Sequence, residues 1–423
     1  MTVEIRPMGI QCNLRCEYCY QNHERDNGTG AKGFDNFDEI KDMIDSDFVL
    51  FGGEALLTPL NKLEELFKHG YEEYGSTGIQ TNGTLITDEH IELFKKYRVH
   101  VGFSIDGKEE LNDLRWAGSL EKTRKLTKKS NENIKKLQEA GVSSSIIITL
   151  HKQNASKEKI PKMKEWLWEL NETGIKSLRF HVLEKEGNDG DNYALTNEEN
   201  FYAFNELMDL NSNPDFKIQI DVYNDIIKLL KGKDNRTTCT FNACDPYVTS
   251  SVADISTNGV NGCGRPHKDG FEWNKGKTPS YIRELSLYHT PQEYGGCKGC
   301  EYFIVCKGHC AGTGINGDWR NRSEYCELHK KMFEQYEKKL EEVNEVPITK
   351  HPMKDEIEKI MIEGYENGYA KKIETIMREI RGGHNQNNKS CNASKPKRTR
   401  EHLDSPHIDS INHSDHSDNK GVV

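Results

Sequence analysis

Residues 3–20 read VEIRPMGIQCNLRCEYCY and contain the two features that decide the fold. The first part, Val3–Ile10, has the character of a strand, and Cys12, Cys16 and Cys19 follow it directly. Thiolates at this spacing can bind one face of an iron–sulfur cube, and three of them leave one of its four irons without a protein ligand. An open metal position is suited to a small-molecule ligand. The sequence therefore predicts a cofactor site at the end of the first strand.

Further strand-like runs alternate with amphipathic stretches, one of which places Leu60, Leu63, Leu66 and Phe67 on one helical face. The predicted strands after the first are Phe48–Phe51, Gly78–Thr81, Val99–Ile105, Ser143–Leu150 and Ser177–Leu183. Such alternation predicts an α/β fold with a parallel sheet, here a partial (β/α)6 TIM-like barrel, with its chemistry at the carboxyl ends of the strands. The lysine-rich segment Glu121–Lys129 is interpreted as a solvated surface insertion.

The motif Cys12-x3-Cys16-x2-Cys19 after a first strand resembles the signature of radical S-adenosylmethionine (SAM) enzymes. The resemblance implies a [4Fe–4S] cluster whose open iron chelates SAM. Reductive cleavage of SAM then gives a 5′-deoxyadenosyl radical that abstracts a hydrogen atom from the substrate. A zinc site is the alternative that the triplet alone leaves open.

Later strand ends also resemble this family. Phe48–Phe51 ends in Gly52-Gly53-Glu54, where glycines permit close backbone approach and a carboxylate accepts hydrogen bonds from the SAM ammonium. Ala55 stands where proline is commoner. The resemblance implies SAM contacts from Tyr18, Gly52, Gly53, Glu54, Asn82, Ser104 and Arg115. Turn formation is the alternative for the Asn-Gly and Asp-Gly pairs near strands three and four. Thr149, Arg179 and His181 at later strand ends are candidates for the cavity, and no catalytic acid or base is assigned.

Eight more cysteines lie between residues 239 and 326, and in a reducing compartment their spacing indicates metal rather than disulfides. Two tetrahedral zinc sites would satisfy eight thiolates equally well. The run resembles the SPASM extension of radical SAM enzymes, which implies two auxiliary [4Fe–4S] clusters and three in all. By this resemblance the first auxiliary cluster takes Cys239, Cys244, Cys263 and Cys310, and the second takes Cys297, Cys300, Cys306 and Cys326. If Cys239 is not a ligand, the first has an open iron that can bind substrate.

Four regions are expected: the radical SAM barrel with bridging helices (1–230), the SPASM domain (231–335), a helical segment (336–381) and a disordered tail (382–423). The bridging helices are predicted at Glu198–Leu210 and Tyr223–Leu230, and a single helix at 354–381. The tail has almost no apolar residues, so it cannot bury enough surface to fold; it holds Cys391 and five histidines, four of which (His402, His407, His413 and His416) lie near its end.

Composition excludes several partners. The net charge of -10 gives no electrostatic case for nucleic acid, and no apolar run can cross a bilayer, so a cytoplasmic protein is expected. Members with a SPASM extension mostly modify peptides, which makes a ribosomally made precursor peptide the expected substrate. Because the cluster motif begins at residue 12, a separate accessory protein is expected to recognise the leader of the precursor. Electrons are expected to come from a donor such as flavodoxin or ferredoxin.

Three peptide reactions compete. The segments Arg6–Gln11 and Tyr20-Gln21-Asn22 resemble maturases of precursors with nitrogen-fixation-like or nitrile-hydratase-like leaders, some of which excise tyramine at a Tyr-Gly site and leave a β-amino acid. The alternatives are thioether or carbon–carbon crosslinking, and formylglycine formation of the anaerobic sulfatase-maturase type. Gly264 after Cys263 counts against the last, since an aspartate base is expected there, although Asp245 follows Cys244. A small-molecule substrate and a zinc-bearing binding module are the remaining hypotheses.

Overall fold

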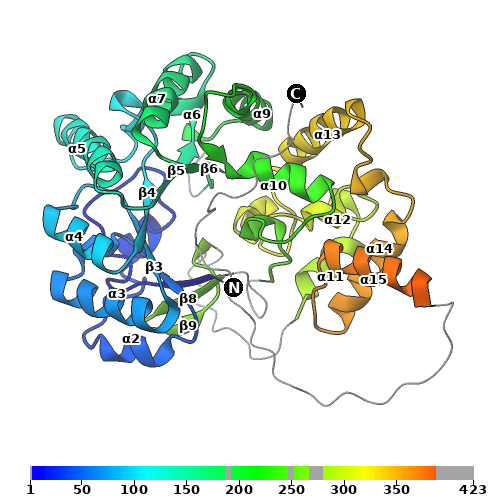
Figure 1. The fold of residues 1–423 in the computed structure, drawn as a ribbon, viewed down its shortest axis with the longest axis horizontal. Coiled ribbons are helices and arrows are strands. Elements are labelled where there is room, and N and C mark those ends of the chain that lie inside the picture. Colours follow the sequence, from blue (N-terminus) through cyan, green and yellow to red (C-terminus); the bar gives the residue numbers. More distant parts are fainter. Residues whose placement is uncertain (1, 186–191, 246–251, 266–279, 387–423) are drawn as a thin grey trace.

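A sheet of nine strands runs through the computed structural model, in the order β7-β6-β5-β4-β3-β2-β1-β8-β9 (Figure 1). The structure describes residues 2–185, 192–245, 252–265 and 280–386. The strands are β1 (Thr2–Ile5), β2 (Phe48–Leu50), β3 (Thr77–Thr81), β4 (Val99–Ser104), β5 (Ser144–Leu150), β6 (Ser177–Val182), β7 (Gln219–Ile220), β8 (Val252–Ser256) and β9 (Gly259–Asn261). The first six are the predicted strands, and they pair in parallel in sequence order. The α/β partial-barrel prediction is confirmed.

Three strands extend this sheet beyond the prediction. β7 pairs with β6 in parallel, whereas β8 pairs in parallel with β1 and turns back into antiparallel β9. β8 and β9 come from the cysteine-rich segment, so that segment contributes structure to the barrel as well as thiols. The boundaries of the four expected regions stay predictions.

Helices connect the strands along the outside of the sheet, which is the right-handed arrangement favoured by parallel strands (Figure 1). In the barrel half they are α1 (Asn22–Asn27), α2 (Asp38–Met43), α3 (Leu60–Tyr74), α4 (Asp88–Lys96), α5 (Leu120–Glu139), α6 (Lys152–Ala155), α7 (Ile160–Thr173), α9 (Asn197–Met208) and α10 (Asp221–Leu230). The second half holds α11 (Ile282–His289), α12 (Phe303–Cys306), α13 (Cys326–Glu342), α14 (Lys354–Glu366) and α15 (Ile373–Gln386). α13 packs against α9 and α10, which joins the two halves. No helix in the described part of the chain is long and apolar enough to span a membrane.

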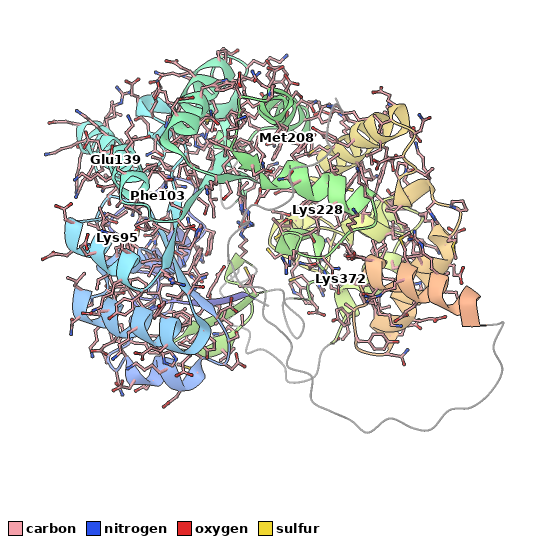
Figure 2. All side chains as sticks on the ribbon, in the orientation of Figure 1. Lys95, Phe103, Glu139, Met208, Lys228 and Lys372 are labelled. Atoms are coloured by element: carbon pink, nitrogen blue, oxygen red, sulfur yellow. The ribbon has the colours of Figure 1, made fainter. Side chains whose placement is uncertain are left out.

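Successive side chains along each strand point alternately into the core between the sheet and the helices and into the barrel interior. In β4, Val101 and Phe103 are fully buried, and Phe103 lies between the sheet and the outer helices (Figure 2). Ser104 points to the other side, into the barrel. The register pairs Ser104 with Ile147 and Thr149 with His181, and all four of these residues line the barrel interior.

Several sequence expectations need correction. Glu121–Lys129 is part of α5, the crossover helix between β4 and β5, because its threonines every fourth residue face inward and are buried. Leu60 begins α3 and is 37% exposed, unlike its apolar partners on that helix. The expected helix at 354–381 is two helices, broken after Glu366 where Gly368 takes a positive φ of 77°.

α15 continues to Gln386, so the first five residues of the segment expected as a tail, 382–386, are helical. The rest of the tail, including Cys391 and its histidines, lies outside the described residues. The bridging helices predicted at Glu198–Leu210 and Tyr223–Leu230 are present as α9 and α10.

Candidate functional site

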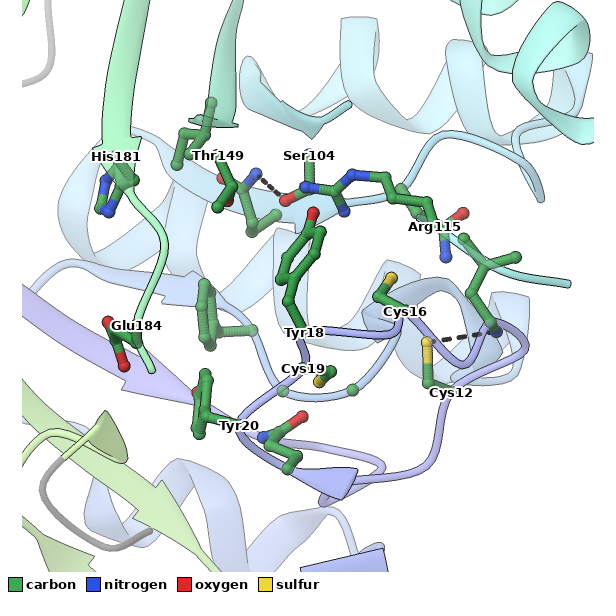
Figure 3. A pocket seen from close by; sticks show the side chains of 18 of the residues that line it. Cys12, Cys16, Tyr18, Cys19, Tyr20, Ser104, Arg115, Thr149, His181 and Glu184 are labelled. Atoms are coloured by element: carbon green, nitrogen blue, oxygen red, sulfur yellow. Dashed lines mark hydrogen bonds between the residues drawn. The ribbon is translucent and has the colours of Figure 1, made fainter. Parts of the chain in front are cut away.

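A cavity opens at the carboxyl ends of the barrel strands, and the cysteine loop forms one side of it (Figure 3). Cys12, Cys16 and Cys19 all line it. Six of the seven predicted SAM-contact residues line it too: Tyr18, Gly52, Gly53, Asn82, Ser104 and Arg115. The structure thus gathers residues from four different strand ends and one loop around a single space.

Side-chain amides hold the cysteine loop in place above β3. The Asn13 amide donates to the Thr84 hydroxyl (2.8 Å), and the Asn82 amide donates to the Asn13 carbonyl oxygen (2.8 Å). Arg25 donates to the Cys19 sulfur at 3.0 Å and to the Ile10 backbone carbonyl at 3.0 Å. These contacts fix the loop that carries the three thiols.

The two glycines after β2 allow backbone to approach backbone. Gly53 N–H donates to the Gly9 carbonyl (3.0 Å) and Glu54 N–H to the Gln11 carbonyl (2.8 Å). A Cβ atom on Gly53 would lie 2.1 Å from the Gln11 oxygen. The sequence predicted that these glycines allow the backbone to approach a ligand closely. The structure shows a second reason for them: the backbone at Gly53 contacts the backbone that leads into Cys12.

Gly53→Ala is accordingly expected to displace the cysteine loop and to lower the iron content of anaerobically purified protein by about four irons per chain, the content of the one cluster that this loop binds. The control is Gly141→Ala, which has a positive φ of 71° but open space around its Cβ, so it measures backbone strain of about 1 kcal/mol without a clash. Equal iron content in the two variants would contradict this account of Gly53.

Glu54 lies beneath the cavity rather than in its lining. Its side chain is buried, and its oxygens accept hydrogen bonds from Leu56 N–H (3.0 Å), the Thr81 hydroxyl (2.6 Å) and Asn82 N–H (2.8 Å). This carboxylate therefore fixes the end of β3, on which Asn82 is carried. In this arrangement its oxygens are already occupied by protein donors, and the expected contact with the SAM ammonium stays a prediction.

A fully buried carboxylate, Asp106, organises the opposite wall. It forms an ion pair with Arg115 at 3.0 Å and accepts hydrogen bonds from the Tyr18 hydroxyl and from Thr149 N–H (3.0 Å). His151 lies 3.5 Å away. Burial alone would raise the pKa of Asp106, but the charge of Arg115 and the interaction with His151 outweigh it and hold this pKa below its usual range. Asp106 is therefore a permanent anion that orients Tyr18 and Arg115, two of the predicted SAM contacts.

The remaining walls come from side chains that no motif marked. Gln80 donates to the Ser104 hydroxyl (2.7 Å), and it can do so because Gly102 leaves room for it: a Cβ atom on Gly102 would lie only 2.1 Å from the Gln80 oxygen. Thr149, His181, Glu184 and Arg265 complete the far side. Thr149 and His181 were candidates from the sequence, whereas Arg179 lines a neighbouring cavity and pairs with Asp221.

A second cavity, in the other half of the molecule, is lined by Cys297, Cys300, Cys306 and Cys326. This is the quartet assigned to one auxiliary cluster by resemblance. Cys306 ends α12 and Cys326 begins α13, so two helix ends bring distant parts of the chain together. Burial raises the pKa of the Cys297 thiol to about 12, and Arg322 and Lys330 lie beside Cys326.

The other predicted quartet is only partly assembled in the structure. Cys239 and Cys310 line one cavity together, and Cys263 interacts electrostatically with Cys239 and with Arg265. Cys244 is held elsewhere by its backbone N–H, which donates to Glu284 (2.7 Å). Residues 246–251 and 266–279, which flank these cysteines, lie outside the described residues. The assignment of Cys239 and Cys244 as ligands stays a prediction.

The thiols suit clusters better than single ions. Within the ranges the structure describes, no three His, Cys, Asp or Glu side chains lie close enough to hold one metal ion. Thiolates that bind different irons of a cube are farther apart than thiolates that share one tetrahedral zinc. Burial raises the pKa of Cys12 to about 11, so its thiol is neutral without metal and loses its proton on binding one. These features are compatible with an iron–sulfur cluster, whereas the loss of the Cys12 proton is common to cluster and zinc binding.

Comparison with known proteins agrees with this site. Residues 7–167 match the family model of the Radical SAM superfamily. The serine-type anaerobic sulfatase-maturating enzyme of Bacteroides thetaiotaomicron is 35% identical over 126 residues, 26% of this chain and 30% of that protein's length. The cysteine-type anaerobic sulfatase-maturating enzyme of Clostridium perfringens is 25% identical over 389 residues, 79% of this chain and 95% of that protein.

The fold has a solved counterpart. The structure of native anSMEcpe with bound AdoMet and Kp18Cys peptide aligns with a TM-score of 0.58 at 21% identity, over 81% of this chain and 98% of that one. Together with the three-cysteine cavity, these matches indicate a SAM-dependent iron–sulfur enzyme, because residues 7–167 are similar to the Radical SAM superfamily and include the three cysteines. More particularly, it is similar over most of its length to enzymes named for anaerobic sulfatase maturation.

Proposed function

We propose that this chain is a peptide or protein maturase with three [4Fe–4S] clusters, one bound by Cys12, Cys16 and Cys19 and two auxiliary. The observation that carries the proposal is the separation of the thiols into a barrel-mouth cavity and a second, four-cysteine cavity. When bound, the first cluster and SAM supply a 5′-deoxyadenosyl radical that abstracts a hydrogen atom from the substrate.

The chain's own residues hold SAM in this proposal. Tyr18, fixed by its hydrogen bond to Asp106, offers a ring face, and Arg115 lies with its guanidinium carbon 5.8 Å from the centre of that ring. Asn82, which follows β3, and Ser104, at the end of β4, are polar residues that line the cavity. Gly52 and Gly53 supply backbone groups beside the thiols.

Three reaction outcomes are carried forward, all on peptides. The names of the relatives favour oxidation of a serine or cysteine in a protein chain. Asp245 is no substitute for the missing aspartate in the barrel cavity, since it is buried beside Arg283 and is absent from the residues lining that cavity. Thioether or carbon–carbon crosslinking and tyramine excision remain alternatives, and the last rests only on the resemblance of residues 6–22.

The test is anaerobic turnover with a defined panel of peptides. Reduced enzyme and SAM are incubated with short peptides that carry a central cysteine, serine or Tyr-Gly pair, and with free amino acids. Mass spectrometry of one modified peptide, with 5′-deoxyadenosine formed in step, is the expected result and identifies the reaction. Modification of free amino acids alone would replace this proposal with a small-molecule substrate.

Loss of the auxiliary quartet gives a separate prediction. The double variant Cys300→Ala/Cys306→Ala is expected to hold about four fewer irons per chain than the wild type, which should hold about twelve. Cys391→Ala is the matched control, because that cysteine stands alone in the sequence and belongs to none of the predicted ligand sets, so its iron content should be unchanged. Unchanged iron in the double variant, or zinc in place of iron, would remove the second cluster from the account.

The proposal also covers the compartment and the partner proteins. A reducing cytoplasm is proposed as the compartment, because the cysteines of the predicted ligand sets must stay reduced to bind clusters. A low-potential donor such as flavodoxin or ferredoxin, and a separate protein that binds the leader of the precursor, are proposed as partners.

A further inference from the structure

One wall of the barrel-mouth cavity is built from three charged or polar side chains that the SAM site does not use. His181 lies near the end of β6, Glu184 follows that strand, and Arg265 comes from the loop after Cys263. Figure 3 shows His181 and Glu184 on the side of the cavity away from Cys12 and Cys16. Both His181 and Arg265 also line the neighbouring cavity of Cys239 and Cys310, so this wall stands between the two cysteine sites.

Arg265 fixes the hydrogen-bonding state of this wall. Its Nε lies 2.9 Å from Glu184 Oε1, and its Nη2 lies 2.6 Å from His181 Nδ1. A guanidinium can only donate, so Nδ1 must accept. Burial, then the positive charges of Arg265 and Arg179, hold the pKa of His181 well below its usual value, so the imidazole is neutral and its proton is on Nε2.

One hydrogen-bond donor and one hydrogen-bond acceptor of this wall have no partner among the described residues. His181 Nε2, a donor, and Glu184 Oε2, an acceptor, are buried and have no hydrogen-bond partner among the described residues. The Glu184 side chain is only 9% exposed. A buried polar group without a partner costs about 1–3 kcal/mol, more when charged, so two at one cavity wall indicate a site shaped for a ligand.

We propose that His181 and Glu184 position the substrate by binding the backbone of one extended peptide residue, with His181 Nε2–H donating to the carbonyl of that residue and Glu184 Oε2 accepting from its N–H. The inference rests on the proposed peptide substrate and adds the residues that recognise it. The N–H and C=O of one residue in extended backbone are neutral and point to the same side of the chain, so they offer one donor and one acceptor, which is the complement of this pair. The bound peptide lies between the SAM site and the Cys239–Cys310 cavity.

The experiment measures affinity rather than turnover. Holoenzyme with SAM and no reductant is titrated with fluorescent short peptides bearing cysteine, serine or Tyr-Gly, and binding is followed by anisotropy. Glu184→Gln keeps the shape and the contact with Arg265 but replaces the Oε2 acceptor with a donor. His181→Phe removes the donor. Each is expected to weaken peptide binding about ten-fold or more relative to wild type.

Two controls separate recognition from general damage. His181→Gln should bind peptide within about three-fold of wild type, because its amide oxygen can accept from Arg265 while its amide NH2 donates into the cavity. Glu139→Gln, a carboxylate at the end of α5 and away from the cavity lining, should bind as wild type does. Iron content and thermal unfolding of each variant establish that it is folded and loaded.

The outcomes distinguish the two proposals. If wild type binds and modifies a peptide but Glu184→Gln and His181→Phe bind it equally well, the positioning role is wrong and the proposed function stands. The positioning role is also wrong, and the proposed function stands, if His181→Gln binds the peptide as weakly as His181→Phe does. If wild type binds none of the peptides and modifies none, the proposed function fails and this inference fails with it.

Discussion

Cys16→Ala is expected to lower formation of 5′-deoxyadenosine from SAM and dithionite by roughly a hundred-fold or more. The three thiols line one cavity, and no other cysteine in the described part of the chain lines it, so the loop has no spare ligand there. Burial raises the pKa of the Cys16 thiol, which means that metal binding, rather than solvent, stabilises its thiolate. Removing it leaves two ligands for a cluster that already has one open iron.

The matched control for this variant is Cys391→Ala, which removes a thiol that belongs to none of the predicted ligand sets. It should retain wild-type iron content and SAM cleavage, whereas Cys16→Ala should also lose about four irons per chain. SAM cleavage by Cys16→Ala at the wild-type rate would show that the barrel-mouth cysteines are not the ligands of the catalytic cluster.

Arg115→Met is expected to lower the free energy of unfolding by about 3 kcal/mol. Arg115 pairs with Asp106, whose side chain is fully buried, so the variant leaves an uncompensated charge in the protein interior. Arg124→Met is the matched control: its ion pair with Asp113 is half-exposed on the arginine side and should contribute at most about 1 kcal/mol. Anaerobic urea denaturation of the three proteins gives the comparison.

The pH dependence of this effect has a defined sign. With Arg115 absent, burial dominates and the pKa of Asp106 rises above its value in the unfolded chain. A carboxyl group of that kind loses stability as pH rises through its folded pKa, so the deficit of Arg115→Met should be larger at pH 8 than at pH 5. The double variant Arg115→Met/Asp106→Asn should regain part of the loss at pH 8. A deficit that is independent of pH and unrelieved in the double variant would contradict the role given to Asp106.

Local patterns were sufficient to predict the barrel. Each of the six strands is a short apolar run bounded by turn residues, and parallel strands with helical crossovers follow from their order. α5 was misread because threonine, serine and asparagine, rather than aliphatic residues, form much of its buried face. β8 and β9 were missed because their partner, β1, is about 250 residues away in the sequence.

The site was predictable where its ligands are contiguous in the chain. Cys12, Cys16 and Cys19 lie in one loop, and their spacing predicted a shared site, whereas Cys297, Cys300 and Cys306 were grouped with Cys326 by resemblance to the SPASM extension. Asp106, Glu184 and Arg265 carry no such signal. Their roles depend on ion pairs across strands, such as Arg265 with Glu184, and only the folded sheet brings these residues together.

Electron paramagnetic resonance of the reduced holoenzyme, with and without SAM, tests the central claim most directly. The auxiliary clusters contribute an overlapping signal, so Cys300→Ala/Cys306→Ala is measured in parallel. If SAM binds an open iron of the cluster held by the barrel-mouth loop, adding SAM shifts part of the signal in both proteins. This shift is absent in Cys16→Ala. A spectrum that is the same with and without SAM, in protein with its full iron content, would contradict it.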